Sequence, residues 1–580
     1  MTERAERTLS GWLGRLVGNR PLRAEAVLLA VAAVLAWVFR FVQDDAFITY
    51  RYARNLARGE GLVLNPGETV EGYTNFAWTV LHAIPERLGW STPVFSQLLG
   101  IVMMLIAVHL TIVISRRVFH SEGFALLVGI VTVANMTFLG YATGGLETMM
   151  QAALLLGVTR ALLDALVDRS AVPTPRLLAA GFLAGLAILT RLDSVVYLVG
   201  LYGAVLVRQW DSRGSLPRLV RTLGVSAVPA VVLVAPWFAW KLSYYGEVLP
   251  NTFFAKSASG PLQPLLYGLF YVVAYFISYG AFLLVGRFRR YRRSYFAVPG
   301  VAALSAVVPL WLAYVVYVGA DFMEYRFMVV ITPVMAMLAA WLLDRFVNLR
   351  TQVLLVAVLA VFSLAHQLIV PPLAFPVLSF RSINHWPSES PTTWLALGNL
   401  LSETFPGGPS VEGQPVIAVA PLGVISYFSD LETVDMLGLA DAEVARNGDD
   451  AQMYYPGHVK MATPRYLEDR GVDLIIGQPG PTRDPQRFDG YRLSQLVEVY
   501  PVTDLRELPP EAVVVELPAT TTRDGVDIVW PTIYLGGNEL VDEAIERNGW
   551  AVKPIIEECD EADLQDWLTS VVADRTCPDL

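Results

Sequence analysis

The sequence has few of the residues that build metal centres and covalent catalytic sites. Its 580 residues include two cysteines and six histidines. No zinc-ligand spacing, Cys-His pair, Ser-His-Asp pattern or glycine-rich phosphate loop stands out, which argues against the enzyme classes that depend on those motifs. Both cysteines, Cys559 and Cys577, lie near the C-terminus. There they would either close a short loop as a disulfide or stay two free thiols.

Charge is scarce and unevenly distributed. Charged residues make up 17% of the chain and hydrophobic residues 54%, a composition typical of membrane proteins. Residues 1–370 contain 30 Lys/Arg and 19 Asp/Glu, a balance of +11, whereas residues 371–580 contain 13 and 34, a balance of −21. This predicts a membrane domain over 1–370 and an acidic soluble domain over 371–580. Nucleic acid is not an expected partner, because binding it needs a basic surface.

Apolar runs divide the first part of the chain into about eleven predicted transmembrane helices. The first run is too long for a signal peptide and is expected to stay as an anchor. Residues 76–90 include Pro85, Glu86 and Arg87 and are predicted to form an amphipathic helix on the membrane surface. The runs are 24–42, 95–115, 122–142, 146–167, 177–190, 193–207, 219–240, 264–286, 297–318, 328–344 and 352–370.

Basic residues in the short loops predict the orientation of these helices. Lys and Arg are retained on the cytoplasmic side, so the arginine-rich N-terminus is placed there. With alternating crossings, every strong arginine cluster then falls on the cytoplasmic side. The loop 43–94, the other acidic and mixed-charge loops and the domain 371–580 fall outside. The predicted protein is therefore a multi-pass protein of the plasma membrane with a cytoplasmic N-terminus.

The last third of the chain shows the pattern of a soluble α/β domain. Residues 416–419 and 474–476 are predicted as buried strands, with a helix over 462–470 between them. The acidic tail from about 541 to 580 is predicted to be helical. His458 is a lone histidine in this domain and is expected to be structural.

The loop 43–94 opens with two adjacent acids, Asp44 and Asp45, directly after the first predicted membrane helix. Charge at the membrane edge is costly, so such acids indicate a functional site that lines a water-filled cavity. The alternative is that they cap the helix that follows, since Asp is favoured at the N-cap and in the first turn.

Several loop motifs carry a resemblance to a known family. They resemble the GT-C superfamily of glycosyltransferases, and more closely the branch that contains the terminal arabinofuranosyltransferases of actinobacterial cell walls. Flagellar motor-control proteins of related sequence share several of them. The motifs are Asp44-Asp45-Ala-Phe-Ile-x-Tyr-Arg51, Asn65-Pro-Gly-Glu68, Glu71-Gly-Tyr-Thr-Asn75, Gly145-Leu-Glu147-Thr, Thr190-Arg191, Pro250-Asn251-Thr-Phe-Phe-Ala-Lys256 and Asp321-Phe-Met-x-x-Arg326-Phe.

The resemblance implies a polytopic α-helical membrane protein whose donor is a polyprenyl-phosphate sugar. Transfer from a lipid phosphate needs a carboxylate for the acceptor hydroxyl and cations for the departing phosphate. We predict the first role for Asp44 or Asp45. The residues predicted to bind the phosphate are Lys256, Arg326, Arg191 and Arg51. The residues predicted to contact the sugar or the acceptor are Glu71, Tyr73, Asn75, Glu147, Asn251 and Asp321.

The sequence identifies no cofactor besides the lipid-linked co-substrate. Asp44 and Asp45, with Glu147 nearby, would supply oxygens for a weak divalent-cation site.

Each of the other predicted site residues has a structural alternative. Arg51 would pair with Glu68 or Glu71, Glu147 would be a first-turn acid, and Lys256 would extend from a helix end towards the membrane surface. Local ion pairs are the alternative for Arg191 with Asp193 and for Asp321 with Arg326. Loop packing is the alternative for Tyr73 and Asn75. The segment from Asp435 to Asp441 resembles a turn of the same branch and is expected near the acceptor groove, or is an ordinary turn.

The predicted function is transfer of arabinofuranose from decaprenyl phosphate to a cell-wall glycan such as arabinan at the outer face of the membrane. The expected partners are therefore the polyprenyl-phosphate sugar, the glycan acceptor and membrane lipid. Alternatives are another polyprenyl-phosphate sugar such as mannose or glucose, and a non-enzymatic cell-envelope or flagellar assembly factor. A transporter would place charges in the middle of the membrane helices and show two related halves, and neither is seen.

Overall fold

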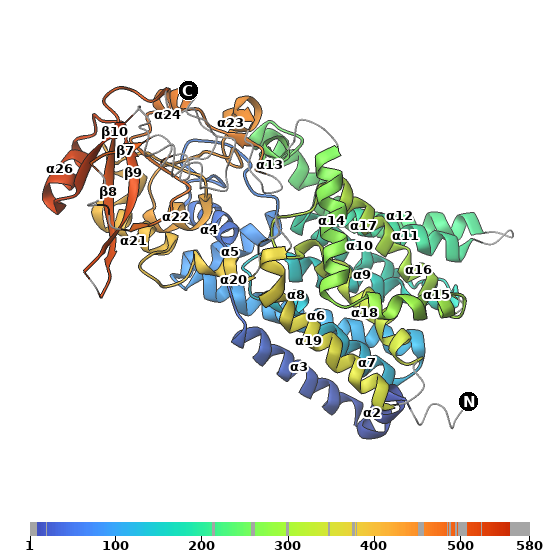
Figure 1. The fold of residues 1–580 in the computed structure, drawn as a ribbon. Helices are drawn as coiled ribbons and strands as arrows, with labels where there is room; N and C mark the ends of the chain where they lie inside the picture. The colour runs from blue at the N-terminus through green and yellow to red at the C-terminus, as the bar shows by residue number, and fades with distance from the viewer. Residues whose placement is uncertain are drawn as a thin grey trace.

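A computed structural model shows a long helical body that ends in a smaller domain containing a β-sheet (Figure 1). It describes residues 8–556 except 19, 211–214, 257–261, 297, 299–300, 346–348, 374–377, 379, 451–457, 484, 486–488, 493–495, 497–506 and 524. Cys559 and Cys577 therefore lie outside the described residues.

Among the residues that the structure describes, five helices of the body are long and apolar enough to cross a membrane. They are α3 (Pro21–Val38), α6 (Thr92–Phe119), α9 (Thr148–Asp168), most of α12 (Ser215–Tyr245), and the continuous stretch of η1 (Arg326–Ile331) and α18 (Thr332–Leu343). Six shorter apolar helices accompany them. These are α7 (Glu122–Val133), α10 (Thr174–Thr190), α11 (Ser194–Gln209), α14 (Leu262–Ser278), α17 (Val307–Tyr317) with its preceding turn, and the first part of α19 (Leu349–Leu373).

Each of the eleven apolar runs predicted from the sequence overlaps one of these helices. An apolar run avoids exposing unpaired backbone groups in lipid only by forming a helix, so the runs predict helices well. Several of the shorter helices fall below the length of a full crossing, and the number of crossings stays a prediction. The helical body is completed by α2 (Leu9–Val17), α8 (Met136–Gly140), α13 (Asn251–Ala255), α15 (Phe282–Phe296), α16 (Val301–Ser305) and α20 (Phe380–His385).

The loop 43–94, which follows the first membrane helix, contains two helices. Helix α4 (Asp44–Arg58) begins with two acids at the positive end of its dipole and ends at Gly59, whose positive φ of 85° suits a glycine C-cap. Helix α5 (Phe76–Leu88) forms where the amphipathic helix is predicted. The two helices pack together between the helical body and the C-terminal domain (Figure 1).

The C-terminal domain is built on a mixed sheet with the order β2-β1-β5-β9-β8-β10-β7, and β6 also pairs with β9. Strands β1 (Ile417–Val419), β2 (Thr433–Asp435) and β5 (Leu474–Gly477) run parallel. The other strands are β6 (Thr482–Arg483), β7 (Tyr491–Arg492), β8 (Val513–Thr521), β9 (Asp527–Tyr534) and β10 (Ala551–Ile556), beside a small ribbon of β3 (Asp449–Asp450) and β4 (Lys460–Met461). Its helices are α21 (Trp394–Thr404), α22 (Leu422–Ser429), α23 (Ala442–Asn447), α24 (Pro464–Asp469) and α26 (Glu539–Asn548), with a short 3-10 turn, η2 (Gly408–Ser410).

The predicted strands at 416–419 and 474–476 and the helix between them are confirmed as β1, β5 and α24. The predicted helical tail is wrong in part. Helix α26 ends at Asn548, and residues 551–556 form β10, which pairs with β8 in antiparallel fashion. Pairing with a distant strand decides the conformation of this segment, and local composition does not report it.

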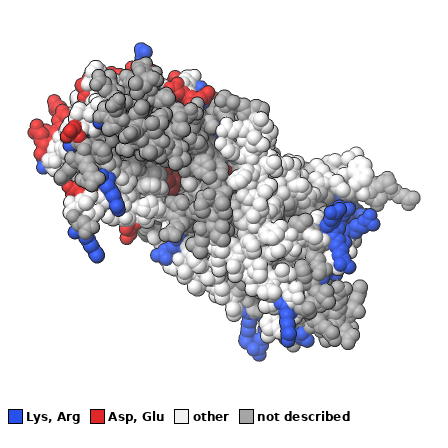
Figure 2. All heavy atoms as spheres, in the orientation of Figure 1, with Lys and Arg blue, Asp and Glu red and all other residues white. Residues whose placement is uncertain are grey.

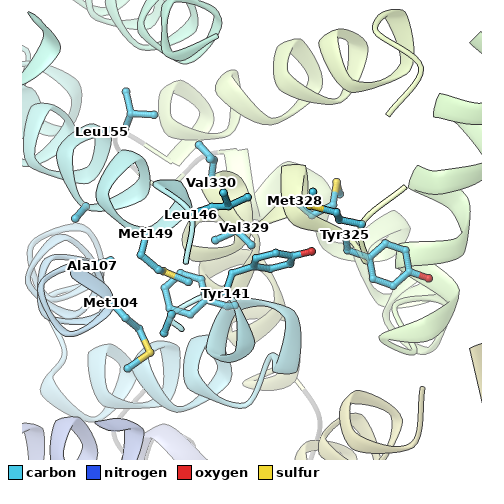
Figure 3. Packing of buried hydrophobic residues seen from close by; sticks show 14 of the residues in the cluster. Met104, Ala107, Tyr141, Leu146, Met149, Leu155, Tyr325, Met328, Val329 and Val330 are labelled. Atoms are coloured by element: carbon cyan, nitrogen blue, oxygen red, sulfur yellow. The ribbon is translucent and has the colours of Figure 1, made fainter. Parts of the chain in front are cut away.

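The buried core includes residues that are adjacent in sequence to two of the polar motif residues (Figure 3). Leu146 belongs to it and precedes Glu147, and Met328 belongs to it and follows Arg326 by two residues. Close packing of this core therefore fixes the backbone from which both polar side chains extend. Its members, drawn from α6, α8, α9, η1 and the adjoining loops, include Met104, Ala107, Tyr141, Leu146, Met149, Leu155, Tyr325, Met328, Val329 and Val330.

Charge is segregated along the molecule. Acidic side chains gather on the C-terminal domain, and a group of basic side chains lies at the far end of the helical body (Figure 2). This agrees with the charge balance of the two parts of the sequence.

Candidate active site

The carboxylate of Asp44 is held by the C-terminal domain. Its Oδ1 accepts the N–H of Val424 at 2.7 Å and its Oδ2 accepts the N–H of Gly423 at 3.1 Å. Asp44 therefore caps the N-terminus of α22, satisfying two backbone N–H groups that the helix leaves unpaired. Asp44 thus acts as a helix cap, as the alternative interpretation of the sequence predicted. The helix that it caps is not α4 but α22, whose Gly423 lies 379 residues further along the chain. Burial raises the pKa of Asp44 to about 7.

A glycine permits this close approach. A Cβ atom on Gly423 would lie 1.9 Å from the backbone oxygen of Asp44, so a larger residue there would push α22 away from α4. The contact between the acid pair and the C-terminal domain thus depends on backbone shape as well as on hydrogen bonds.

Asp45 is the acid of the pair that has no such bond. It is half-buried, and its carboxylate makes no hydrogen bond or ion pair with any residue that the structure describes. Burial raises the pKa of Asp45, while the charges of Lys256 and Arg326 act to lower it. Asp45 therefore faces cations from two other loop motifs, and the structure brings together residues that are far apart in the sequence.

Arg326 and Lys256 approach Asp45 in different ways. The Nη2 atom of Arg326 lies 2.6 Å from Oδ2 of Asp321, so the predicted local ion pair is present, and both side chains are largely buried. Lys256 ends the short helix α13 and is exposed. Lys256 is therefore the more accessible of the two cations near Asp45.

A second network lies beside this group. Glu147 is buried, and its Oε1 is 2.6 Å from Nη1 of Arg191 while its Oε2 accepts the amide N–H of Asn75 at 2.7 Å. Arg191 also forms the predicted pair with Asp193, at 2.7 Å. The charges of Glu147 and Arg326 influence one another, which places this network against the first group. Glu147 is thus a buried partner of two other motifs rather than a simple first-turn acid.

The structure argues against a phosphate role for Arg51. Its side chain is completely buried, and its nitrogens donate to the carbonyl oxygens of Leu64, Ser426 and Leu431, each at 3.2 Å. It also forms an ion pair with Asp430 of the C-terminal domain. The predicted alternative, pairing with Glu68 or Glu71, is replaced by this contact. Arg51 ties two parts of the chain together and has no accessible face for a ligand.

Three residues predicted to contact sugar or acceptor are likewise engaged inside the protein. Glu71 forms a buried ion pair with Lys241 of α12. The hydroxyl of Tyr73 lies 3.2 Å from that of Tyr245. The amide of Asn251 donates to the carbonyl oxygens of the turn after β2, including that of Gly438 at 2.8 Å. These contacts favour structural roles for all three.

The turn from Asp435 to Asp441 is part of the same junction. The carboxylate of Asp435 accepts the N–H groups of Leu437 at 2.9 Å and Ala440 at 2.7 Å, and burial raises its pKa to about 7. A Cβ atom on Gly72 would lie 2.8 Å from that of Ala440, so the turn packs directly against the loop 43–94. His458 packs edge-on against Phe322, beside Asp321.

Sequence reasoning missed the partners that hold this junction. Asp430, Lys241 and Arg470 were not singled out, although each forms an ion pair with a motif residue. Lys241 carried a usable signal, because a lysine at the end of an apolar helix needs a partner. Asp430 and Arg470 are ordinary surface residue types and carried none.

The structure offers little for a metal ion. No group of three or more His, Cys, Asp or Glu side chains suited to a metal occurs among the residues that the structure describes. Both carboxylate oxygens of Asp44 are used by N–H groups, so the acid pair does not present four free oxygens to a cation.

Comparison with known proteins identifies similar sequences and folds. A family model described as a domain of unknown function (DUF8728) matches residues 389–522. A terminal β-(1→2)-arabinofuranosyltransferase of Corynebacterium glutamicum is 27% identical over 351 residues, covering 52% of this chain and 48% of that protein. The enzyme of the same name from Mycobacterium tuberculosis is 27% identical over 241 residues, covering 39% and 36%. The matches thus span about half the length of these relatives or less.

The fold extends over most of the chain. The crystal structure of ArnT from Cupriavidus metallidurans bound to undecaprenyl phosphate superposes with a TM-score of 0.55 at 15% identity, covering 87% of this chain and 97% of that one. The same protein in the apo state gives a TM-score of 0.54. The chain is thus an integral membrane protein with the GT-C glycosyltransferase fold whose sequence is similar to that of the terminal arabinofuranosyltransferases, as the loop motifs predicted.

Proposed function

We propose that the chain is a glycosyltransferase that moves a sugar from a polyprenyl phosphate to a glycan acceptor at the outer face of the plasma membrane. Arabinofuranose is the first candidate for the sugar and an arabinan-type cell-wall glycan for the acceptor, because the similar enzymes are named terminal arabinofuranosyltransferases. ArnT was crystallised with undecaprenyl phosphate, which supports a lipid-linked donor. The basic cytoplasmic loops favour a cytoplasmic N-terminus and an extracytoplasmic C-terminal domain.

One observation carries the proposal. Asp45 is a half-buried carboxylate without a hydrogen-bonding partner among the described residues, next to Lys256 and Arg326. A buried charge that is not hydrogen-bonded is costly, and such groups concentrate at functional sites. Asp44, by contrast, uses both oxygens to cap α22. The two adjacent acids therefore have different tasks, and Asp45 is the candidate base.

The proposed step uses Asp45 as a general base. Its carboxylate takes the proton of the acceptor hydroxyl while that oxygen bonds to the anomeric carbon of the sugar. The bond between the anomeric carbon and the phosphate oxygen breaks, and the lipid phosphate leaves with the electron pair. General-base catalysis of this kind typically contributes ~10²–10⁴ in rate.

Lys256 and Arg326 would stabilise the phosphate as it leaves. Charge builds on the phosphate in the transition state, and pre-positioned cations stabilise it. Lys256 is exposed and can reach a ligand, whereas Arg326 is held in place by Asp321. The network of Glu147, Arg191 and Asn75 would keep the site in shape by fixing three loops relative to one another.

The test is a transfer assay with the purified full chain. Donors are decaprenyl-phosphate arabinofuranose and polyprenyl phosphates of mannose and glucose, with a short arabinan as acceptor. We expect transfer from the arabinofuranose donor, and Asp45→Asn should lower turnover by ~10²–10⁴. Asp44→Asn is the matched variant. Asparagine keeps one side-chain oxygen and is also a good N-cap, so this variant should still cap α22. It should therefore lower turnover less than about tenfold.

Two outcomes would contradict the proposal at different levels. If Asp44→Asn abolishes transfer and Asp45→Asn does not, the roles of the two acids are reversed. If the folded wild-type protein transfers no sugar from any donor, the chain is not such an enzyme and a cell-envelope assembly role is favoured.

A further inference from the structure

Helix α5 exposes an apolar stripe that continues onto a membrane helix. Val80, Ile84 and Leu88 follow one another at intervals of four residues and are 38%, 47% and 54% exposed. Residues four apart lie on the same face of a helix, so they form one continuous stripe. Trp90 is also exposed and lies in the short connection between α5 and α6. An apolar stripe with a tryptophan beside the end of a membrane helix is typical of a segment at the membrane surface.

An arginine-lined pocket opens next to this stripe. It has a volume of about 220 Å³ and is lined by Arg54, Ala57 and Arg58 of α4 and by Glu86 and Arg87 of α5. Arg87 is exposed and has no recorded partner among the described residues of the chain. At 100° per residue, Arg87 lies about 20° from Val80 around the helix, at the edge of the stripe.

The acids close to the pocket already have partners. Glu86 accepts hydrogen bonds from Thr92 at 2.7 Å, from Tyr427 at 2.6 Å and from Arg54 at 3.3 Å. Asp430 pairs with Arg51 and with Arg58. The pocket therefore retains an unneutralised guanidinium at its rim, on the side where the apolar stripe runs.

The site is separate from the candidate active site. Arg54 follows Asp45 by nine residues, which is ~13.5 Å along a helix. Three guanidinium groups suit a phosphate, and the volume is below that typical of a pocket for a drug-sized ligand. An apolar stripe beside a phosphate-sized pocket matches the two chemically different parts of a phospholipid.

We propose that this pocket binds the phosphate group of an anionic phospholipid, with the acyl chains along the stripe of Val80, Ile84 and Leu88. The lipid would hold the loop 43–94 at the membrane surface. This inference does not depend on the proposed reaction, because it rests on other residues and is tested by lipid binding alone.

The experiment measures lipid binding to the purified full chain by native mass spectrometry. The probes are dioleoyl phosphatidylglycerol and dioleoyl phosphatidylcholine, which differ in head-group charge and share their acyl chains. We expect tighter binding of the anionic lipid. Arg87→Gln should weaken that binding about fivefold, the effect of one basic residue near a membrane surface, and should weaken binding of the zwitterionic lipid less, because its choline cation offsets the phosphate charge.

Arg40→Gln is the matched control. Arg40 is exposed just beyond α3, over the ring of Trp37 at 4.7 Å, and does not line the pocket. Its replacement should leave binding unchanged. Equal binding of the two lipids, or equal losses in the two variants, would overturn the proposal. Displacement of the lipid by an equal concentration of soluble glycerol phosphate would also overturn it, because the pocket would then recognise phosphate esters without the membrane.

Discussion

Replacing Arg51 tests whether this residue joins the two parts of the molecule or binds a ligand. Arg51 is completely buried and donates to three carbonyl oxygens on two sides of the junction, besides its ion pair with Asp430. Arg51→Ala would remove one hydrogen bond from each of these buried carbonyl oxygens and would take from Asp430 its most buried partner, leaving it with Arg54 and Arg58. We expect the C-terminal domain to dock less firmly on the loop 43–94.

The magnitude follows from the burial of the pair. Removing one partner of a buried ion pair typically costs ~3–5 kcal/mol, because the remaining groups lose their solvation as well as their partner. Arg58 provides the matched comparison, since it lies two turns along the same helix and pairs with the same Asp430 at 2.9 Å. Its side chain is 40% exposed, and an exposed pair contributes only ~0.2–1 kcal/mol. Arg51→Ala should therefore weaken docking at least 20-fold more than Arg58→Ala.

The assay combines resistance to trypsin with thermal unfolding in detergent for wild type and the two variants. Arg51→Ala should release the C-terminal domain to proteolysis and lower the first unfolding transition, whereas Arg58→Ala should behave nearly as wild type. A different pattern would refute the reasoning. If Arg51→Ala left stability unchanged and raised the KM for the lipid donor, Arg51 would be a phosphate ligand, as the sequence motif predicted.

Two further predictions concern the same junction. Gly423→Ala would place a Cβ atom 1.9 Å from the backbone oxygen of Asp44 and should separate α22 from α4, lowering transfer activity and trypsin resistance together. Gly203→Ala is the control, because a Cβ on Gly203 meets nothing within 4 Å and should change neither; equal effects of the two variants would contradict the steric argument. The second prediction concerns pH. Burial raises the pKa of both Asp44 and Asp435 from 3.8 to about 7, so between these values the folded chain binds more protons than the unfolded chain. The free energy of unfolding should therefore fall as the pH rises from about 4 through 7. Asp44→Asn should make this dependence shallower in unfolding experiments at pH 5, 6, 7 and 8, and an unchanged slope would show that Asp44 does not titrate in this way.

Local pattern was sufficient for the apolar helices and for two central strands of this protein. The apolar runs predicted the helices because a backbone in lipid must satisfy its own hydrogen bonds. The short runs of Val, Ile and Leu at 416–419 and 474–476 predicted two central strands, and the charge balance predicted the two parts of the chain. The loop motifs also predicted the fold, which extends over most of the chain.

Part of the site could be predicted as well. The pairs of Arg191 with Asp193 and of Asp321 with Arg326 are local in sequence, and both are present. The neighbourhood of Asp45, Lys256 and Arg326 was predicted from loops that share one end of the membrane domain. In these cases the partners are close in the chain or are constrained by the membrane to one side.

Only the tertiary structure decided which motif residues are accessible. Asp44 and Asp45 are adjacent and chemically identical, yet one caps a helix 379 residues away and the other has no such partner in the part of the chain that the structure describes. Arg51 meets Asp430 across the same separation, and β10 is a strand because β8 lies beside it. The sequence by itself determined the apolar helices, the two central strands at 416–419 and 474–476, and the kinds of side chain available for catalysis. Which of them face a ligand depends on how the C-terminal domain packs on the loop 43–94, and such long-range contacts leave no periodic pattern in the chain.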